Sequence, residues 1–256
     1  MLHFGLIGRS LGHSFSKKFF SAKFANEQID ADYELIELDS IDQIDQAIAE
    51  HSLSGFNVTI PYKESIIPHL DELSDEAKAV GAVNCVVIKD GRKIGHNTDI
   101  TGIEASLEWL DIDADTRALI LGTGGASKAV QHVFGRYNIP FDIVSRTKGK
   151  GDYTYSELSS EVLAQHNLIV NTTPVGMSPD NDSAPDLCYD LLNSGHRLFD
   201  LVYNPAQTRF LEYGKAHGAK TLGGMLMLQT QAIASWHIWQ RELAIGTTEC
   251  TNGNVC

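Results

Sequence analysis

The chain has few cysteines, few prolines and few positive charges. Its 256 residues include 4 cysteines, 7 prolines, and 20 lysines and arginines against 33 aspartates and glutamates. No two cysteines form a Cys-x-x-Cys pair, so we expect free thiols rather than a disulfide framework: Cys85, Cys188, Cys250 and Cys256. The histidines include no His-Glu-x-x-His spacing, and we expect no metal site.

The charge balance and the absence of long apolar runs argue against two classes of partner. A formal net charge of −13 disfavours nucleic acid. No run of ~18 apolar residues is present, so we expect no membrane span. The start, Met1-Leu2-His3-Phe4, lacks the charged region and apolar core of a secretory signal, which predicts a cytoplasmic protein. The size and acidity are compatible with a monomer or a homodimer.

A glycine cluster near the middle of the chain is typical of a dinucleotide-binding turn. It follows the apolar run Ala118–Leu121, reads Gly122-Thr123-Gly124-Gly125-Ala126-Ser127, and leads into helical spacing. Gly122 allows a tight turn, and Gly124 lets the backbone approach a pyrophosphate. The helix that follows offers its N-terminal N–H groups to the anion. Ser127 stands at the third position of the fingerprint, where glycine is usual.

The end of the next expected strand favours NADP over NAD. Phe141-Asp142-Ile143-Val144 runs into Ser145-Arg146-Thr147-Lys148, with Lys150 close behind. An NAD site places an acid there for the ribose 2′-hydroxyl, and such an acid would repel a 2′-phosphate. Arg146 offers a planar fork that fits phosphate oxygens. An ordinary solvated turn is the alternative interpretation of the same cations.

Apolar periodicity predicts alternating strands and helices along the chain. Strands are expected at 2–8, 33–38, 55–61, 85–88, 93–95, 118–121, 141–144, 168–171 and 197–203. Helices are expected at 17–26, 41–48, 71–80, 103–110, 206–214 and 225–243, and after the glycine cluster. Asp90-Gly91 signals a hairpin. The strand–helix–strand pattern from Ala118 onward favours a parallel sheet.

Polar residues follow several expected strands. Ser14 and Ser16 suit hydrogen bonds to a carboxylate or hydroxyl, or else cap the next helix. Lys63 follows the third strand, where an amine at a cleft would exchange protons with a substrate; a surface lysine is the alternative. Asp99 is either a helix N-cap or the carboxylate partner of Lys63.

Two amides are further candidates. Asn84 is either a turn residue or a donor to a substrate oxygen. Gln229 lies in a long, mostly apolar helix, and because a buried amide needs partners, a ligand contact is one explanation. Its neighbours Met225–Leu228 fit a core better than a cofactor contact.

Taken in order along the chain, seven segments resemble the shikimate dehydrogenase family. They are Gly8…His13-Ser14-Phe15-Ser16, Asn57-Val58-Thr59-Ile60-Pro61-Tyr62-Lys63, Gly81-Ala82-Val83-Asn84, Asn97-Thr98-Asp99-Ile100-Thr101-Gly102, Gly122-Thr123-Gly124-Gly125-Ala126-Ser127, Asn171-Thr172-Thr173-Pro174-Val175-Gly176-Met177 and Met225-Leu226-Met227-Leu228-Gln229. Each segment alone is a weak signal, whereas seven in order are specific. The resemblance extends to about Leu243.

The resemblance implies an α/β fold with two domains. Residues 1–101 would form an α/β substrate-binding and catalytic domain, and residues 102–222 a Rossmann-like NADP-binding domain. Residues 223–244 would form a long C-terminal helix that returns toward the substrate domain, and residues 245–256 a polar tail.

The resemblance also implies an activity, the NADPH-dependent reduction of 3-dehydroshikimate to shikimate on the route to chorismate and the aromatic amino acids. Lys63 would exchange the proton at the C3 oxygen, with Asp99 as its partner. The substrate would be bound by Ser14, Ser16, Thr59, Lys63, Asn84, Asp99, Tyr203 and Gln229. The cofactor would be held by Gly122, Thr123, Gly124, Gly125, Ala126, Ser127, Ser145, Arg146, Thr147, Lys150, Thr172, Leu201 and Gly223.

Three positions depart from the family pattern without removing an expected ligand. Ser10 and Lys17 stand where the family usually has proline, and Ser145 stands where it often has asparagine. Two other functions stay open, a quinate/shikimate dehydrogenase of broader specificity and a catalytically silent NADP-sensing regulator. The regulator would be expected to lack Lys63 or Asp99, and both are present.

Overall fold

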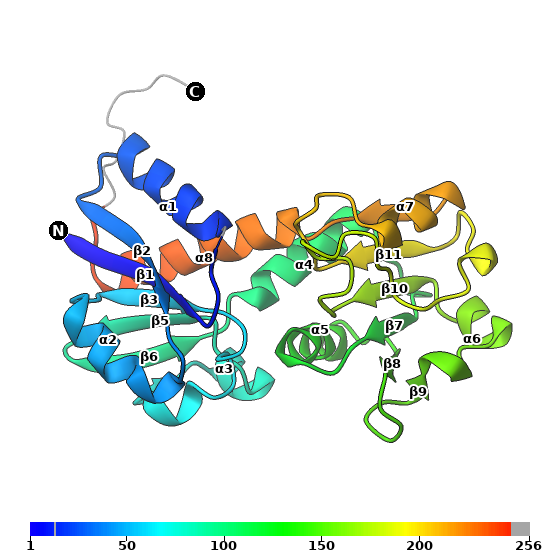
Figure 1. Cartoon of the computed structure of the whole chain (residues 1–256), viewed down its shortest axis with the longest axis horizontal. Coiled ribbons are helices and arrows are strands. Elements are labelled where there is room, and N and C mark those ends of the chain that lie inside the picture. Colours follow the sequence, from blue (N-terminus) through cyan, green and yellow to red (C-terminus); the bar gives the residue numbers. More distant parts are fainter. Residues whose placement is uncertain (13, 247–256) are drawn as a thin grey trace. The chain divides into compact units, whose positions relative to one another are not determined.

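The protein is described by a computed structural model that covers residues 1–12 and 14–246. The chain forms two compact units (Figure 1). Unit 1 consists of Met1–Ser74, Val83–His96 and the chain from Ala232 onward, and unit 2 consists of Asp75–Ala82 and Asn97–Gln231. Each unit is therefore built from separate stretches of sequence. Residues 247–256, most of the expected polar tail, lie outside the described residues.

Unit 1 contains a mixed sheet in the order β2-β1-β3-β5-β6-β4. β1 lies parallel to β2 and β3, whereas β5 lies antiparallel to both β3 and β6. The carboxyl ends of β1 and β3 and the start of β5 consequently share one edge of the sheet. The bounds are β1 Leu2–Gly8, β2 Ala31–Glu37, β3 Gly55–Val58, β4 Glu72–Leu73, β5 Cys85–Lys89 and β6 Arg92–His96.

Helix α1 (Phe15–Asn26) and the second half of α8 (Met225–Glu242) pack on one face of this sheet, and α2 (Ile44–Glu50) covers the other (Figure 1). The core under α1 and α8 is aromatic, with Phe4 stacked on Trp239 at a centroid distance of 4.4 Å.

Local sequence determines where the helices of unit 1 begin. Ser14 caps α1, and Ser40 forms a capping box with Gln43 at the short turn η1 (Ile41–Gln43). A second short turn, η2, spans Ile67–His69.

Unit 2 contains a parallel sheet in the order β12-β11-β10-β7-β8-β9. Taken in sequence order this is the 3-2-1-4-5-6 arrangement of doubly wound dinucleotide-binding folds, in which ligands bind beyond the carboxyl ends of the strands. The bounds are β7 Ala118–Leu121, β8 Phe141–Ser145, β9 Tyr153–Thr154, β10 Leu168–Asn171, β11 Arg197–Asp200 and β12 Lys220–Leu222.

Helices cover both faces of the unit 2 sheet because its strands are apolar on both sides. One face packs against α4 (Asp99–Leu110) and α5 (Gly125–Arg136), and the other against α6 (Ser160–Ala164) and α7 (Arg209–Ala216). Alternate residues of β7 divide between these two cores, Ile120 in the first and Leu119 and Leu121 in the second. The remaining short elements are α3 Asp75–Val80, η3 Tyr155–Glu157 and η4 Tyr189–Leu191.

The expected α/β fold with a doubly wound second half is confirmed, and several local predictions are wrong. Residues 71–80 form β4 and then α3 rather than one helix. The strand expected at 197–203 ends at Asp200, and the helix expected at 206–214 spans Arg209–Ala216. The short elements β9, β12 and α6 were not expected. None of the helices in the described part of the chain is long and apolar enough to cross a membrane.

Candidate functional site

The structure gathers the expected substrate-binding residues of unit 1 at one edge of its sheet. Ser14 and Ser16 begin α1 beyond the end of β1, and Thr59 and Lys63 follow β3. Thr59 N donates to Ile7 O at 2.9 Å, so the exits of these two parallel strands lie side by side. Ser16 is buried, and the other three are half-buried. Hydroxyl and ammonium groups at one edge suit an oxygen-rich anionic ligand.

Lys63 lies in a turn that is bonded to the segment before β5. The carbonyl oxygen of Lys63 accepts a hydrogen bond from Val83 N at 2.7 Å. Asn84, which follows Val83 in the chain, accepts a hydrogen bond at its own carbonyl oxygen from Val58 N at 2.9 Å. Asn84 itself is buried, with 2% relative exposure. Two backbone bonds therefore place Lys63 and Asn84 on the same small region of unit 1.

A buried polar network that we did not expect from the sequence runs beneath these residues. Asn57, within β3, accepts from the Tyr33 hydroxyl at 2.9 Å and donates to Asn84 O at 3.1 Å and to Ser235 Oγ at 2.9 Å. A hydrogen bond to Ser16 lowers the pKa of Tyr33, but burial has the larger effect and raises it well above its usual value. The one sequence signal was a polar residue inside the apolar strand Gly55-Phe56-Asn57-Val58. Asn57 links Ser16, through Tyr33, to Asn84.

The glycine cluster of unit 2 forms a turn between β7 and α5. Gly122 has a φ of +113°, and a Cβ there would lie 2.7 Å from Thr172 Oγ1, so glycine is required. A Cβ on Gly124 would meet nothing within 4 Å. Gly124 is the N-cap of α5 and has no side chain to accept from the backbone. The first N–H groups of α5 are therefore suited to bind an anion. Ser127 is buried and closes the turn by donating to Gly122 O at 2.8 Å, which explains serine at the third fingerprint position.

The loop after β8 is cationic and exposed. Arg146, Thr147, Lys148 and Lys150 are all exposed, whereas Ser145 is buried and its hydroxyl accepts from Thr147 N at 3.1 Å. This bond turns the chain sharply at the strand end. The arrangement places a guanidinium and two ammonium groups beyond the second strand of the doubly wound order, where an adenosine 2′-phosphate is read in such folds.

The other expected cofactor residues also follow strand ends of this sheet. Thr172 follows β10, and its hydroxyl donates to Leu121 O at 2.7 Å. Leu201 follows β11, with its backbone N donating to Asn171 O at 3.0 Å. Gly223 follows β12. The sequence placed these residues far apart, and the parallel sheet brings all of them to its carboxyl edge.

Three expected substrate residues belong to unit 2. Asp99 is buried and is the first residue of α4; the N-cap position is Thr98, so the alternative interpretation of Asp99 as the N-cap is wrong. Tyr203 is half-buried, and burial raises the pKa of its phenol. Gln229 is exposed on α8, so the reasoning that relied on its burial is wrong, although an exposed amide is still open to a ligand. The pairing of Lys63 with Asp99 joins residues of different units and stays a prediction.

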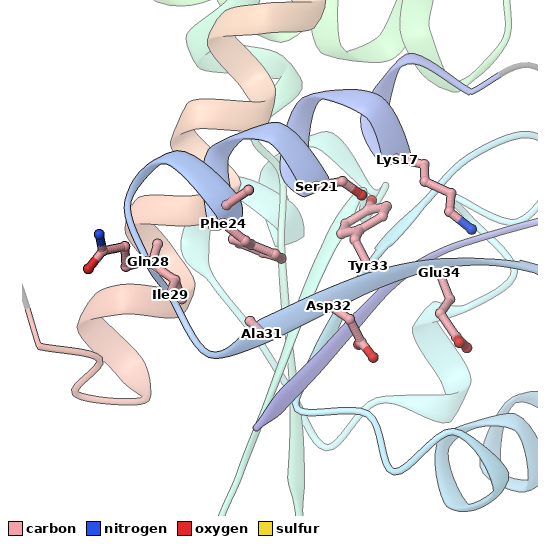
Figure 2. Close-up of a pocket in the computed structure, with 10 residues that line it drawn as sticks. Lys17, Ser21, Phe24, Gln28, Ile29, Ala31, Asp32, Tyr33 and Glu34 are labelled. Carbon is pink, nitrogen blue, oxygen red and sulfur yellow. The ribbon is translucent and has the colours of Figure 1, made fainter.

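Two surface depressions are lined by other residues. One, of about 540 Å³, is lined by α1 and β2, with Lys17 and Phe24 from the helix and Asp32 and Glu34 from the strand (Figure 2). The other, of about 780 Å³, lies in unit 2 against α4. Neither contains an expected site residue.

Within the described ranges, no three His, Cys, Asp or Glu side chains are grouped to hold a metal ion.

Fold and site together define a class. Unit 2 has the strand order, glycine turn and cationic second loop of a dinucleotide-binding domain, and unit 1 presents a lysine among hydroxyl and amide groups. A dinucleotide-dependent oxidoreductase combines a cofactor that carries hydride with a residue that moves a proton. Comparison with known proteins then identifies the family.

A family model described as "Shikimate dehydrogenase substrate binding domain" matches residues 6–86. A shikimate dehydrogenase (NADP(+)) from Clostridium beijerinckii is 37% identical over 253 residues, covering 94% of this chain and 92% of the relative. A shikimate 5-dehydrogenase from Thermus thermophilus in complex with NADP(H) and shikimate is 30% identical with a TM-score of 0.84, over 94% of each chain. The chain belongs to the shikimate dehydrogenase family.

A solved quinate dehydrogenase from Corynebacterium glutamicum in complex with NAD shares the fold. It is 26% identical, with a TM-score of 0.83 over 94% of each chain. The fold therefore occurs with a second polyol substrate and a second dinucleotide. The choice between them depends on particular residues rather than on architecture.

Proposed function

We propose that this protein catalyses the reversible NADPH-dependent reduction of 3-dehydroshikimate to shikimate. The observation that carries the proposal is the combination of a glycine turn and a cationic loop in unit 2 with the lysine-centred polar edge of unit 1. Relatives that match over nearly the whole chain are named for this activity. Such an enzyme serves the route to chorismate and the aromatic amino acids, and we expect it to act in the cytoplasm as a monomer or homodimer.

Residues of unit 2 fit NADP on three grounds. The φ of Gly122 permits the tight turn, and the space beside Gly124 leaves the backbone open to a pyrophosphate. Arg146, Lys148 and Lys150 supply positive charge for the 2′-phosphate at a position where NAD sites carry an acid. The cofactor would be held by residues 122–127, by Ser145, Arg146, Thr147 and Lys150, and near its nicotinamide by Thr172, Leu201 and Gly223.

The substrate would be held mainly by hydroxyl and amide groups. Ser14 and Ser16 would bind the shikimate carboxylate, supported by Thr59 and Tyr203. Asn84, Asp99 and Gln229 would hold the ring hydroxyls. These roles follow from the family resemblance and from the position of each side chain within its own unit. Domain roles follow in the same way: residues 1–101 supply most of the substrate site and residues 102–222 the cofactor site, with the helix at 223–244 contributing Gln229.

The reaction divides between cofactor and protein. NADPH supplies the hydride for the C3 carbonyl carbon. As negative charge develops on the C3 oxygen, Lys63 donates a proton to it, and in the reverse direction Lys63 accepts that proton from the hydroxyl. We propose that Asp99 orients the ammonium group of Lys63 toward the C3 oxygen. Buried Asn84 holds a neighbouring oxygen, so that the ring is fixed while the proton moves.

One assay tests the proposal. Absorbance at the NADPH band is followed while shikimate and quinate are each offered with NADP and with NAD. We expect turnover with shikimate and NADP to exceed every other combination. Equal or greater turnover of quinate would instead support the broader quinate/shikimate dehydrogenase, which the neighbour from Corynebacterium glutamicum keeps as the second candidate. Cofactor binding without turnover of either substrate would support a silent NADP-sensing regulator.

A further inference from the structure

Asp200, the last residue of β11, is a fully buried carboxylate to which the proposed mechanism gives no role. Its side-chain oxygens accept hydrogen bonds from Asn171 Nδ2 at 3.0 Å, from Val202 N at 3.0 Å and from the Thr208 hydroxyl at 2.5 Å. These donors belong to the end of β10, the chain after β11 and the N-cap of α7. One side chain therefore ties together three segments at the carboxyl edge of the sheet.

Two of those segments lead directly into the loops expected at the nicotinamide. Asn171 Oδ1 accepts from both Thr173 N at 3.1 Å and Thr173 Oγ1 at 2.6 Å, which shapes the loop that contains Thr172. After β11, Val202 O accepts from Gly224 N at 3.0 Å, next to Gly223. Asp200 is thus linked by hydrogen bonds to the segments that contain Thr172, Leu201 and Gly223, but it is not itself one of the expected cofactor contacts.

We propose that Asp200 is a positioning residue, whose carboxylate holds the loops at Thr172 and Leu201 in the arrangement that accepts the nicotinamide end of the dinucleotide. This inference rests on the proposed binding of NADP. A carboxylate accepts from all three donors at once, and hydrogen bonds to a charged acceptor are the stronger kind. A neutral side chain holds these partners less strongly. In an asparagine or a protonated aspartate the oxygen that accepts from Asn171 and Val202 no longer carries charge, and the other atom presents a donor to Thr208, whose hydroxyl must then turn to accept.

Mild acid removes the negative charge of Asp200 without a mutation, because the carboxylate becomes protonated. Burial raises the pKa of Asp200 to about 6, although hydrogen bonds from Thr208, Val202 and Asn171 lower it in part. Among the described residues, Tyr189 of η4 is a titratable group on which the charge of Asp200 acts; burial and then the charge of Asp200 raise the pKa of that phenol above its usual value. Asn171 and Thr208, its other side-chain neighbours, do not titrate. Near pH 5 the wild-type protein therefore carries a neutral Asp200.

The test uses two ligands that share one end of the site. NADPH is compared with 2′-phospho-ADP-ribose, which keeps the adenine, the 2′-phosphate and the pyrophosphate but has no nicotinamide. NADPH fluorescence gives one dissociation constant, and displacement of NADPH gives the other. In Asp200→Asn the NADPH constant rises about tenfold, as expected when the hydrogen bonds to Asp200 lose their charge, while that of 2′-phospho-ADP-ribose changes less than about twofold.

The matched control is Asp142→Asn. Asp142 belongs to the same sheet and accepts from His166 at 2.8 Å and Arg117 at 3.2 Å, but it lies at the start of β8, away from the carboxyl edge. Both dissociation constants of this control stay within about twofold of wild type. The control thereby distinguishes a general effect of losing a hydrogen-bonded carboxylate in this sheet from a specific effect of losing the one that holds the nicotinamide loops.

The wild-type pH profile is the second readout. The 2′-phosphate itself titrates at a pKa of about 6, but it is common to both ligands, and the pyrophosphate of both stays charged over this range, so the effect of the 2′-phosphate cancels in the ratio of the two dissociation constants. Between pH 8 and pH 5 this ratio changes about tenfold in wild type, with NADPH weakened, and stays constant in Asp200→Asn.

Three results overturn the positioning role of Asp200: equal weakening of both ligands in Asp200→Asn, no weakening of NADPH, or a flat wild-type ratio. The last needs no variant and therefore decides the matter even if Asp200→Asn does not fold. Failure of the proposed function is distinguishable, because a wild type that binds both ligands but turns over no shikimate leaves the binding ratios measurable.

Discussion

Asn57 in β3 donates a hydrogen bond to Ser235 in α8 at 2.9 Å, across 178 positions of sequence. The same side chain accepts from Tyr33 and donates to Asn84 O, so it joins four segments of unit 1 in the interior. A buried amide needs partners for each of its polar atoms, and only the folded chain provides them. The polar edge with Ser16 and Asn84 therefore depends on a buried residue that, in our proposal, does not touch the substrate.

The first prediction concerns Asn57→Ala. Loss of three buried hydrogen bonds should lower the free energy of unfolding by about 2–4 kcal/mol, measured by urea denaturation of the full chain. The KM for shikimate should rise as well, because Asn84 and Ser16 lose a common support. Gln46→Ala is the control, since Gln46 is exposed and its side chain donates to Glu50, which is also exposed; it should change stability by less than about 0.5 kcal/mol. Equal stability of the two variants would contradict the prediction.

Sequence reasoning succeeded where the signal is local. The glycine turn, the apolar strands of unit 2 and the Asp90-Gly91 hairpin depend on residues close in sequence, and the structure contains each of them. The left-handed φ values of Asp90 and Gly91 are those that a two-residue hairpin needs.

It failed where tertiary contacts decide the outcome. Residues Asp71–Ser74 have acidic, helix-compatible composition, yet Glu72 and Leu73 pair with β6 as a short strand. The apolar neighbours of Gln229 predict a buried amide, but the position of Gln229 on α8 leaves it exposed. Asp200 followed an apolar run like many strand ends, and nothing nearby in the sequence reveals that Asn171 and Thr208 meet there.

The second prediction concerns proton transfer. Lys63→Ala should lower kcat by about a hundredfold or more with little change in the KM for shikimate, because the proton donor acts mainly in the transition state. Steady-state kinetics with NADP and shikimate measure both constants. Lys18→Ala is the control, an exposed lysine of α1 that has no expected role, and it should leave both constants unchanged. Near-normal turnover of Lys63→Ala would remove Lys63 from the mechanism.

The third prediction separates binding from chemistry. Ser14→Ala should raise the KM for shikimate about tenfold and leave kcat near its wild-type value, because one hydrogen bond to the substrate carboxylate is lost. Ser14 also caps α1, with its hydroxyl accepting from Ser16 N at 3.2 Å. Ser40→Ala is therefore the matched control: it removes a helical cap elsewhere in unit 1 and should cost about 1 kcal/mol of stability without altering KM. If both variants raised KM equally, capping rather than substrate binding would explain Ser14.

The fourth prediction concerns the choice of dinucleotide. Arg146→Ala should raise the KM for NADPH by about 10- to 100-fold, the loss of one or two charge-assisted phosphate contacts, and change that for NADH less than about twofold. Arg136→Ala is the control. Arg136 lies in the same unit and pairs with Glu104 at 3.1 Å, far along α5 from the glycine turn. An equal loss with NADPH and NADH would show that Arg146 does not read the 2′-phosphate.

The fifth prediction uses the buried charge of Asp200 as a stability probe. Burial raises its folded pKa to about 6, above the usual value of 3.8 that it regains on unfolding. Between these values the folded state binds the extra proton, so the free energy of unfolding falls as pH rises through this window and is level above it. A difference of about two pKa units corresponds to about 3 kcal/mol. Asp200→Asn has no such proton to lose.

Urea denaturation of both proteins at intervals from pH 4 to pH 7 measures the effect. The stability of wild type minus that of Asp200→Asn should fall by about 2.4 kcal/mol over this range, most of the full difference, because the unfolded carboxyl is already partly ionised at about pH 4. Asp142 shifts in the other direction: burial alone would raise the pKa of its carboxyl, but the hydrogen bonds from His166 and Arg117 outweigh burial and lower it. The difference between wild type and Asp142→Asn should therefore not fall as pH rises. If the stability difference between wild type and Asp200→Asn did not change with pH, the carboxyl of Asp200 would have the same pKa in the folded and unfolded states. The three hydrogen bonds to Asp200 would then offset the whole effect of burial on that pKa.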